Sequence, residues 1–255
     1  MVELVYRPVV GAALATFRVM GWDVRTTGTE HIPTTGPAVI AANHIGYLDF
    51  VFLGMGAHRR GRLVRFMAMK EAFGHWLGGP LLRGMRHIPV DREGTPNSAL
   101  RAAVGALRSG EVVGIHPEGG MSRSYVPAPG KTGAARMAIE SGAPLVPTAV
   151  WGSQRILAAG HRPKWPRDVV VTVSFGPPIE SGAGADPGEV TAELMANIGA
   201  QVDHAARAYP QHPRGPADRW WVPAHLGGTA PTVEEGLAMS RAASARRRAR
   251  RAAGG

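Results

Sequence analysis

The sequence of 255 residues contains no cysteine. That absence excludes disulfides, thiolate nucleophiles and every metal site built on cysteine. Lysine is scarce as well, and occurs only at positions 70, 131 and 164. No run of about 18 or more residues is apolar and free of charge, so we predict no conventional transmembrane helix. Hydrophobic residues nevertheless make up 44% of the chain, which permits a sizeable core and excludes global disorder.

Positive charge is plentiful and unevenly placed. The formal net charge is +10 at pH 7, and so basic a chain favours anionic partners such as nucleic acid, anionic lipid or phosphorylated small molecules. Residues 236–255 carry +6 of this charge, all of it on arginine, and no acid. We predict a disordered or weakly helical basic arm, which either draws the protein to an anionic membrane or serves only as a solubilising tail. No helix-turn-helix, zinc knuckle or RNP-type aromatic pattern accompanies it, so we predict no specific nucleic-acid partner.

Residues 1–25 predict an amphipathic helix. Apolar side chains recur at helical spacing at Val2, Val5, Val9, Ala13, Phe17 and Met20. The uncharged stretch between Arg7 and Arg18 spans about 15 Å as a helix, roughly half the hydrocarbon core of a bilayer. Of two interpretations, we favour a helix that lies in the plane of a membrane surface over one that packs on the core of the domain.

Short apolar runs alternate with segments of helical spacing between residues 37 and 209. The expected strands are 37–42, 63–69, 86–90, 111–115, 144–150 and 168–175, and the expected helices are 49–57, 71–77, 97–109, 131–141 and 186–209. This alternation predicts an α/β fold, with a central mixed sheet and helices on its faces. From residue 210 the chain is rich in proline and glycine. We therefore divide it into an N-terminal helix (1–25), a central domain (26–209) and a C-terminal extension (210–255).

A histidine and an aspartate follow the first expected strand, in Asn43-His44-Ile45-Gly46-Tyr47-Leu48-Asp49. In α/β sheets, chemistry gathers on loops at the carboxyl ends of strands. Imidazole takes up a proton near neutral pH, and a carboxylate that reaches one ring nitrogen fixes the tautomer and supports the imidazolium. No serine or cysteine nucleophile is evident nearby, so the natural nucleophile is a hydroxyl of the substrate. The alternative is a loop histidine next to an aspartate that caps a helix.

A second loop follows Val90 and contains Asp91 and Arg92. A guanidinium at a strand end offers a bidentate fork for a phosphate. The alternative is an ion pair between these two neighbours on a solvated turn.

The third loop reads His116-Pro117-Glu118-Gly119-Gly120-Met121-Ser122-Arg123-Ser124. The two glycines allow the backbone to approach a ligand closely and to present N–H groups to an oxyanion or phosphate. The carboxylate of Glu118 can accept hydrogen bonds from hydroxyls, and Arg123 and Lys131 add cations. The alternative is a glycine-rich turn with scattered charges.

Taken in order, these motifs resemble the glycerolipid acyltransferase family, in particular its lysophosphatidic acid acyltransferases. The resemblance is carried by Asn43-His44-x4-Asp49, Pro89-Val90-Asp91-Arg92, Pro117-Glu118-Gly119 and Leu145-Val146-Pro147, over about residues 37–152. It implies the following roles for the residues of this chain. His44 is the general base and Asp49 orients it. Arg92 binds the acceptor phosphate, Glu118 and Gly119 hold the acceptor, and Val146 and Pro147 shape the acyl side.

The expected substrate-binding set has four further members, Asn43, Gly120, Arg123 and Lys131. Asn43 opens the first motif, the backbone at Gly119 and Gly120 steadies the oxyanion, and Arg123 and Lys131 assist with the phosphate. Neither a metal nor a bound cofactor is required. Three positions depart from the family pattern, because His116 replaces its aromatic residue, Gly120 its threonine and Met121 its arginine. The departures lie in the acceptor loop, so acceptor identity stays open while the catalytic pair is intact.

We therefore predict an enzyme that transfers a fatty acyl group from acyl-CoA or acyl-ACP to the hydroxyl of a lysophospholipid. The first choice is 1-acylglycerol-3-phosphate, which gives phosphatidic acid in phospholipid biosynthesis. We expect the protein at the cytoplasmic face of the cell membrane as a peripheral or monotopic protein, on an anionic lipid surface. Trp220, Trp221 and the arginine arm would add membrane contacts, unless the tryptophans pack in the core. Two alternatives remain, a different lipid or glycolipid acceptor and a non-catalytic basic adaptor for membrane or nucleic acid.

Overall fold

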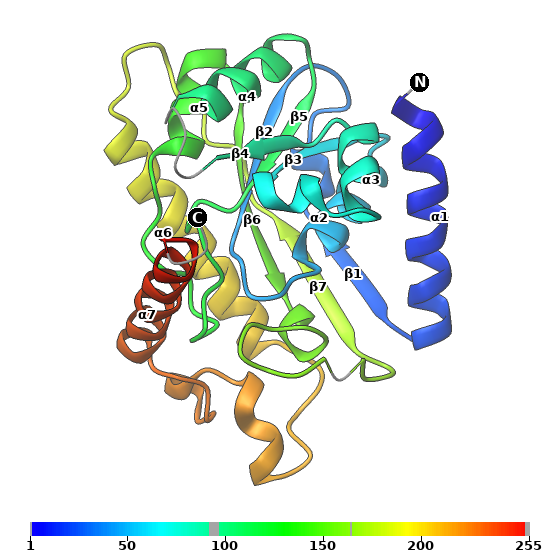
Figure 1. Cartoon of the computed structure of the whole chain (residues 1–255), viewed down its shortest axis with the longest axis vertical. Coiled ribbons are helices and arrows are strands. Elements are labelled where there is room, and N and C mark those ends of the chain that lie inside the picture. The colour runs from blue at the N-terminus through cyan, green and yellow to red at the C-terminus, as the bar shows by residue number, and fades with distance from the viewer. Residues whose placement is uncertain (1, 92–96, 164, 253–255) are drawn as a thin grey trace.

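The computed structural model describes residues 2–91, 97–163 and 165–252 (Figure 1). The strands are Asp23–Thr27 (β1), Ala38–Ala42 (β2), Val64–Met69 (β3), Ile88–Val90 (β4), Val112–Ile115 (β5), Leu145–Trp151 (β6) and Val170–Phe175 (β7). Within the described residues they form one sheet in the order β1-β7-β6-β2-β5-β3-β4. All neighbours run parallel except β6 and β7, which are antiparallel. The predicted α/β fold with a mixed central sheet is therefore confirmed.

Helices cover both faces of this sheet. They are Val2–Met20 (α1), Asp49–His58 (α2), Gly78–Gly84 (α3), Ser98–Arg108 (α4), Gly133–Ser141 (α5), Pro187–Arg207 (α6) and Val233–Ala252 (α7). Side chains alternate across a strand, so β2 contributes Val39 and Ala41 to a core shared with α4, α5 and α6. Ile40 of the same strand points into a second core shared with α1 and α2. Because both of its faces are buried, β2 is apolar along its whole length.

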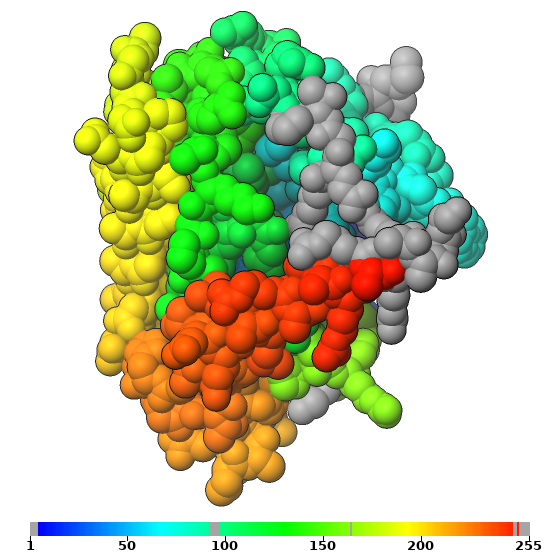
Figure 2. Space-filling view, turned by 60° about the vertical axis from the view of Figure 1, so that its left-hand side comes forward, coloured from blue at the N-terminus to red at the C-terminus, as the bar shows by residue number. Residues whose placement is uncertain are grey.

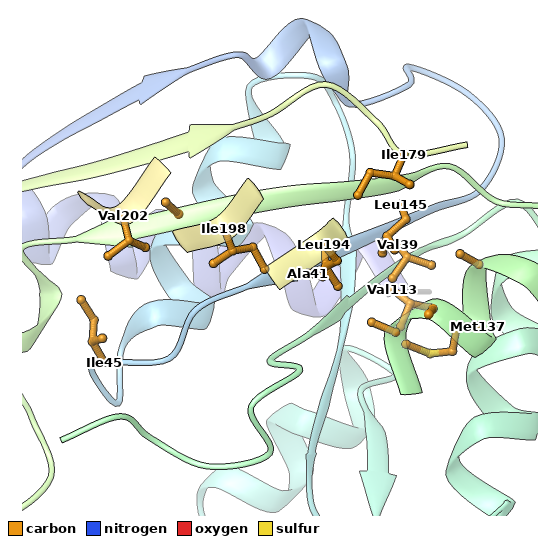
Figure 3. Packing of buried hydrophobic residues seen from close by; sticks show 14 of the residues in the cluster. Val39, Ala41, Ile45, Val113, Met137, Leu145, Ile179, Leu194, Ile198 and Val202 are labelled. Atoms are coloured by element: carbon orange, nitrogen blue, oxygen red, sulfur yellow. The ribbon is translucent and has the colours of Figure 1, made fainter. Parts of the chain in front are cut away.

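The first of these cores holds α6 against the centre of the sheet. Figure 3 shows Leu194, Ile198 and Val202 of α6 lying along β6 and β2. These three side chains recur at helical spacing, and each is nearly or wholly buried. The helix begins where the sequence predicts, because the Asp186 side chain accepts a hydrogen bond from the Glu189 N–H at 2.9 Å.

One expected helix, at residues 71–77, is wrong. The chain instead forms a 3₁₀ turn at Lys70–Gly74 (η2) and then begins α3 at Gly78, within a Gly-Gly-Pro sequence that is typical of a helix end. Proline is tolerated in the first turn of a helix, where its missing N–H has no partner to lose. Nδ1 of His75 accepts hydrogen bonds from the N–H groups of Leu77 and Gly78, at 3.3 and 3.1 Å, and so marks the start of α3.

The N-terminal helix packs on the domain core, which is the second of the two interpretations. The ring of Phe17 stacks on Phe52 of α2 with centroids 5.3 Å apart, and the hydroxyl of Tyr6 donates a hydrogen bond to the Val64 carbonyl. Leu14 and Val19 remain exposed on the outer side of α1. Among the described helices, none is both long and apolar enough to cross a membrane.

Of the two forms predicted for the C-terminal arm, disordered or weakly helical, the structure has the helical one, since Val233–Ala252 forms α7. Its start is fixed by a capping box, in which Thr232 Oγ1 accepts from the Glu235 N–H at 3.3 Å and the Glu235 carboxylate accepts from the Thr232 N–H at 2.8 Å. The alanines and arginines that follow are strong helix formers. In Figure 2, α7 lies across the front of the molecule, and Gly236 packs against the backbone at Ser124.

The two tryptophans of the extension do not form an exposed pair. Trp221 is 3% exposed and packs in the core beside Tyr209, and the ring of Trp220 lies against that of His161 with centroids 4.3 Å apart. For Trp221 the core-packing interpretation is therefore correct.

Candidate active site

The first motif lies at the carboxyl end of β2, in the middle of the sheet, with β5 and β6 on either side. Asn43 is wholly buried, and its amide pairs with the backbone of Val150 in β6. It accepts from the Val150 N–H at 2.8 Å and donates to the Val150 carbonyl at 3.0 Å. Asn43 thus fixes the start of the His44 loop against the neighbouring strand.

His44 and Asp49 face each other directly. Nδ1 of His44 lies 2.9 Å from Oδ2 of Asp49, and this oxygen also accepts the N–H groups of Ile45 and Gly46 at 2.8 and 2.9 Å. Since a carboxylate only accepts, Nδ1 of His44 carries the proton and Nε2 presents its lone pair. Asp49 is wholly buried, whereas the His44 side chain is 23% exposed and open to a substrate.

The second oxygen of Asp49, Oδ1, accepts a hydrogen bond from the hydroxyl of Ser153. This serine lies in the turn Ser153–Arg155 (η3) that follows β6. Burial alone would raise the pKa of Asp49, but hydrogen bonds from His44 and Ser153 and the nearby imidazoles lower it below its usual value. The carboxylate is therefore ionised at neutral pH and can stabilise an imidazolium on His44. Sequence reasoning missed Ser153, although a Gly-Ser pair directly after a buried strand at this edge of the sheet was an available signal.

Glu118 binds the backbone of the first motif. Its Oε1 accepts from the His44 N–H at 2.7 Å, and Oε2 accepts from the Ala128 N–H at 2.8 Å. Burial raises the pKa of Glu118 to about 8, while these two backbone donors favour its ionised form. The Ser122 N–H donates to the His44 carbonyl at 2.7 Å, so the third motif binds both the N–H and the carbonyl of His44.

The ring of His116 stacks on the ring of His44, with centroids 4.2 Å apart and planes 12° apart. Nδ1 of His116 donates to the carbonyl oxygens of Ala42 and Asn43, both at 3.0 Å. Burial and the neighbouring His44 lower the pKa of His116 to about 4, so it is a neutral ring at pH 7. In this way the departure at His116 keeps a flat, uncharged ring against the ring of His44.

The two glycines of the third motif differ in their surroundings, because Lys131 fills the space at Gly119 while the space at Gly120 is open. Gly119 has a φ of +67°, and a Cβ there would lie 3.0 Å from Cε and Nζ of Lys131. The Lys131 amine is therefore placed over the Gly119 backbone. A Cβ at Gly120 would meet nothing within 4 Å, so the place of the family's threonine side chain is open.

The remaining predicted site residues are not part of the group formed by His44, Asp49, His116 and Glu118. Arg123 is partly buried beside Gly160, and Arg92 lies outside the described residues. Asp91 forms an ion pair with Lys70 at 2.9 Å. Val146 and Pro147 are buried within β6, so they offer no open wall to an acyl chain.

An apolar cavity of about 410 Å³ lies between the 125–129 segment, α6 and the C-terminal extension, and none of the predicted site residues lines it. Among the described residues, no group of three or more histidine, aspartate or glutamate side chains is arranged to hold a metal ion.

A family model described as Acyltransferase matches residues 23–151, which include the His44 loop and the Glu118 loop. The chain belongs to the acyltransferase family. This confirms the resemblance seen in the motifs and the prediction of an O-acyltransferase. The acyltransferase match ends with β6, so the C-terminal extension lies beyond it.

Several named proteins are similar to this acyltransferase. A 1-acyl-sn-glycerol-3-phosphate acyltransferase of Bacillus subtilis is 36% identical over 140 residues, which is 55% of this chain and 68% of the relative. A 1-acyl-sn-glycerol-3-phosphate acyltransferase of Limnanthes douglasii is 29% identical over 167 residues, covering 64% of this chain and 57% of the relative. The crystal structure of the LPA acyltransferase PlsC from Thermotoga maritima matches with a TM-score of 0.63 at 20% identity, over 76% of this chain and 77% of that chain, which shows a shared fold.

Proposed function

We propose that this acyltransferase esterifies the free hydroxyl of 1-acylglycerol-3-phosphate with an acyl group from a thioester donor, which gives phosphatidic acid. The observation that carries the proposal is the pairing of His44 Nδ1 with the buried Asp49 carboxylate at 2.9 Å. It leaves the Nε2 lone pair of a partly exposed imidazole available for a substrate hydroxyl. The acceptor is proposed from the names of the two relatives.

The proposed reaction has two steps. Nε2 of His44 removes the proton of the acceptor hydroxyl as the oxygen attacks the thioester carbonyl, and Asp49 stabilises the imidazolium that forms. The C–S bond then breaks, and the imidazolium returns the proton to the departing thiolate. An ester and a free thiol are the products. The Gly119 N–H already donates to the His116 carbonyl at 3.1 Å, so the Gly120 N–H is the backbone donor proposed to stabilise the oxyanion.

Cations near the third motif are proposed to bind the acceptor phosphate. The Lys131 amine lies over Gly119, and Arg123 belongs to the third motif itself. We assign Arg92 to the same phosphate from the sequence motif. The donor is acyl-CoA or acyl-ACP, and a comparison of the two with one acceptor decides between them.

A different acceptor is the second candidate, and the open space at Gly120 favours it. A larger head group, as in another lysophospholipid or a glycolipid, would fill the place where the family carries threonine. A panel of acceptors with labelled acyl donor separates the two candidates. Formation of phosphatidic acid at the highest kcat/KM supports the first, and a clear preference for another acceptor overturns it.

We also propose that the protein acts at the cytoplasmic face of the cell membrane as a peripheral or monotopic protein. The support is an apolar surface on α3 and on the turn between η2 and α3, formed by Trp76, Leu77 and Leu81, which are 80%, 57% and 42% exposed. This surface follows the carboxyl end of β3, at the same edge of the sheet as His44. Tryptophan is enriched where proteins meet the membrane interface. A lipid acceptor that enters from the bilayer at this edge of the sheet would arrive on the side where His44 lies.

A further inference from the structure

The catalytic carboxylate is held from two directions. Oδ2 of Asp49 accepts donors from its own loop, which are His44, Ile45 and Gly46. Among the described residues, Oδ1 has a single donor, the hydroxyl of Ser153. Asp49 and Ser153 are both 0% exposed, so no water can replace that hydroxyl without a change in packing.

The turn that carries Ser153 packs directly on the His44 loop. A Cβ at Gly46 would lie 2.9 Å from Oγ of Ser153 and 3.1 Å from its carbonyl group. The Tyr47 N–H donates to the Leu157 carbonyl at 2.9 Å, which joins the two segments a second time. A shift of the turn would therefore move the carboxylate that orients His44.

The C-terminal extension holds this turn in place. The side-chain oxygen of Gln154 accepts from the Gly152 N–H at 2.8 Å, and its amide nitrogen donates to the Trp221 carbonyl at 3.3 Å. The guanidinium of Arg155 lies 4.6 Å from the centre of the Trp221 ring and donates to Gln211. In Figure 1 the extension (orange) lies beneath the sheet, next to the loop that follows β6.

We propose that Ser153 is a positioning residue for Asp49, and that the C-terminal extension acts through Gln154 and Arg155 to hold it there. The extension lies beyond the family match at residues 23–151, and it then helps to fix the geometry of the active site. The proposal rests on the proposed role of His44 as the general base. The Ser153 hydroxyl fixes the rotation of the carboxylate, so that Oδ2 faces His44 Nδ1 throughout the reaction.

The first experiment measures kcat, acceptor KM and the pH profile of kcat/KM for Ser153→Ala, with free thiol release as the assay. Loss of a buried hydrogen bond to a charged group lowers kcat by about 10- to 100-fold, with acceptor KM changed by less than about 3-fold. The acid limb of the pH profile of kcat/KM moves to higher pH. The reason is that an Asp49 carboxylate with one hydrogen-bond donor fewer attracts the proton shared with His44 more strongly. Ser174→Ala is the matched control, because its hydroxyl pairs with Gln201 at 3.2 Å and not with the dyad.

The second experiment tests the extension without truncating it. Gln154→Met removes both hydrogen bonds of Gln154 at similar volume, and we expect kcat to fall by about 3-fold or more with the same direction of pH shift. Gln201→Met is the matched control, since Gln201 bonds the Pro147 carbonyl and Ser174 rather than the turn at Ser153–Arg155. The kcat of this variant should stay within about 2-fold of wild type.

The outcomes separate this proposal from the proposed function. Wild-type kcat and an unshifted pH profile in Ser153→Ala overturn the proposal, as does an unchanged profile in Gln154→Met. If Ser153→Ala does not fold, judged by circular dichroism, Gln154→Met and Arg155→Lys decide by the same two readouts. Retained turnover in His44→Ala instead overturns the role of the base, whatever the Ser153 variant does.

Discussion

The imidazole rings of His116 and His44 lie parallel, with centroids 4.2 Å apart. Two positive imidazoles at that distance would repel each other, and the pKa of His116 is lowered to about 4 by burial and by His44. His116 therefore serves as a neutral ring against which His44 can gain and lose a proton. The aromatic residue that the family carries at this position could do the same.

We expect His116→Phe to keep kcat within about 3-fold of wild type, because phenylalanine preserves the stacked ring. His116→Ala removes the stack and leaves a cavity beside the base, so we expect a loss of about 10-fold or more in kcat. Steady-state kinetics at pH 7.5 measures both. Equal activity of the two variants would show that the stacked ring has no role in catalysis.

Buried histidines should make the fold sensitive to acid. His87 is 6% exposed, its Nδ1 accepts from the Phe66 N–H at 3.0 Å, and burial followed by the charge of Arg65 lowers its pKa to about 4. The unfolded chain takes up this proton below about pH 6.5, whereas the folded chain takes it up only below about pH 4. The free energy of unfolding should therefore fall between these values, by about 3 kcal/mol for this residue.

Urea unfolding of wild type and His87→Asn between pH 7 and pH 4 measures this effect. Asparagine keeps an acceptor but does not titrate, so the variant should lose less stability than wild type as the pH falls. His212→Asn, at an exposed position, is the control and should follow wild type. Identical pH dependence in wild type and His87→Asn would rule out a protonation-linked role for His87.

Lys131 should act on the acceptor more than on the chemical step. Its amine lies over the Gly119 backbone, beside the loop that holds His44. Removing a charge-assisted hydrogen bond to phosphate in Lys131→Met should raise acceptor KM by about 10-fold, with a smaller change in kcat. Arg136→Gln, an exposed position on α5, serves as the control. An unchanged KM in Lys131→Met would remove this residue from the phosphate site.

The Trp76 surface should govern attachment to lipid. We expect the double variant with Trp76→Ser and Leu77→Ser to bind vesicles containing anionic lipid about 10-fold more weakly than wild type. Trp165→Ser, which changes an exposed tryptophan outside η2 and α3, should bind as wild type does. Co-sedimentation with vesicles measures both. Equal binding of all three proteins would place the lipid contact elsewhere on the molecule.

The local parts of the site could be predicted from the sequence, and the parts built from distant segments could not. His44 and Asp49 lie in one loop, so their spacing already indicates that they can meet. The hydrogen bonds of Glu118 to His44 and of Ser153 to Asp49 join different strands, and only the strand order brings them together. The place of Glu118 in its motif therefore did not reveal that its carboxylate binds the backbone N–H of His44.

The same distinction explains the elements that sequence reasoning missed. β1 is a polar edge strand, Asp-Val-Arg-Thr-Thr, which lacks an apolar run and becomes a strand by pairing with β7. In α3, Gly-Gly-Pro indicates a stop when read alone, and it forms a helix because the preceding turn at His75 caps it. The order of α/β elements between β2 and α6 was predictable because their apolar periodicity is strong.

The most direct test of the account is the turnover of His44→Ala with lysophosphatidic acid and acyl-CoA, followed by the release of free thiol. With a circular dichroism spectrum like that of wild type, the variant should lose about 10²- to 10⁴-fold in kcat, because the proposed general base is removed. Turnover within a few-fold of wild type by the folded variant would contradict the assignment of His44 as the base.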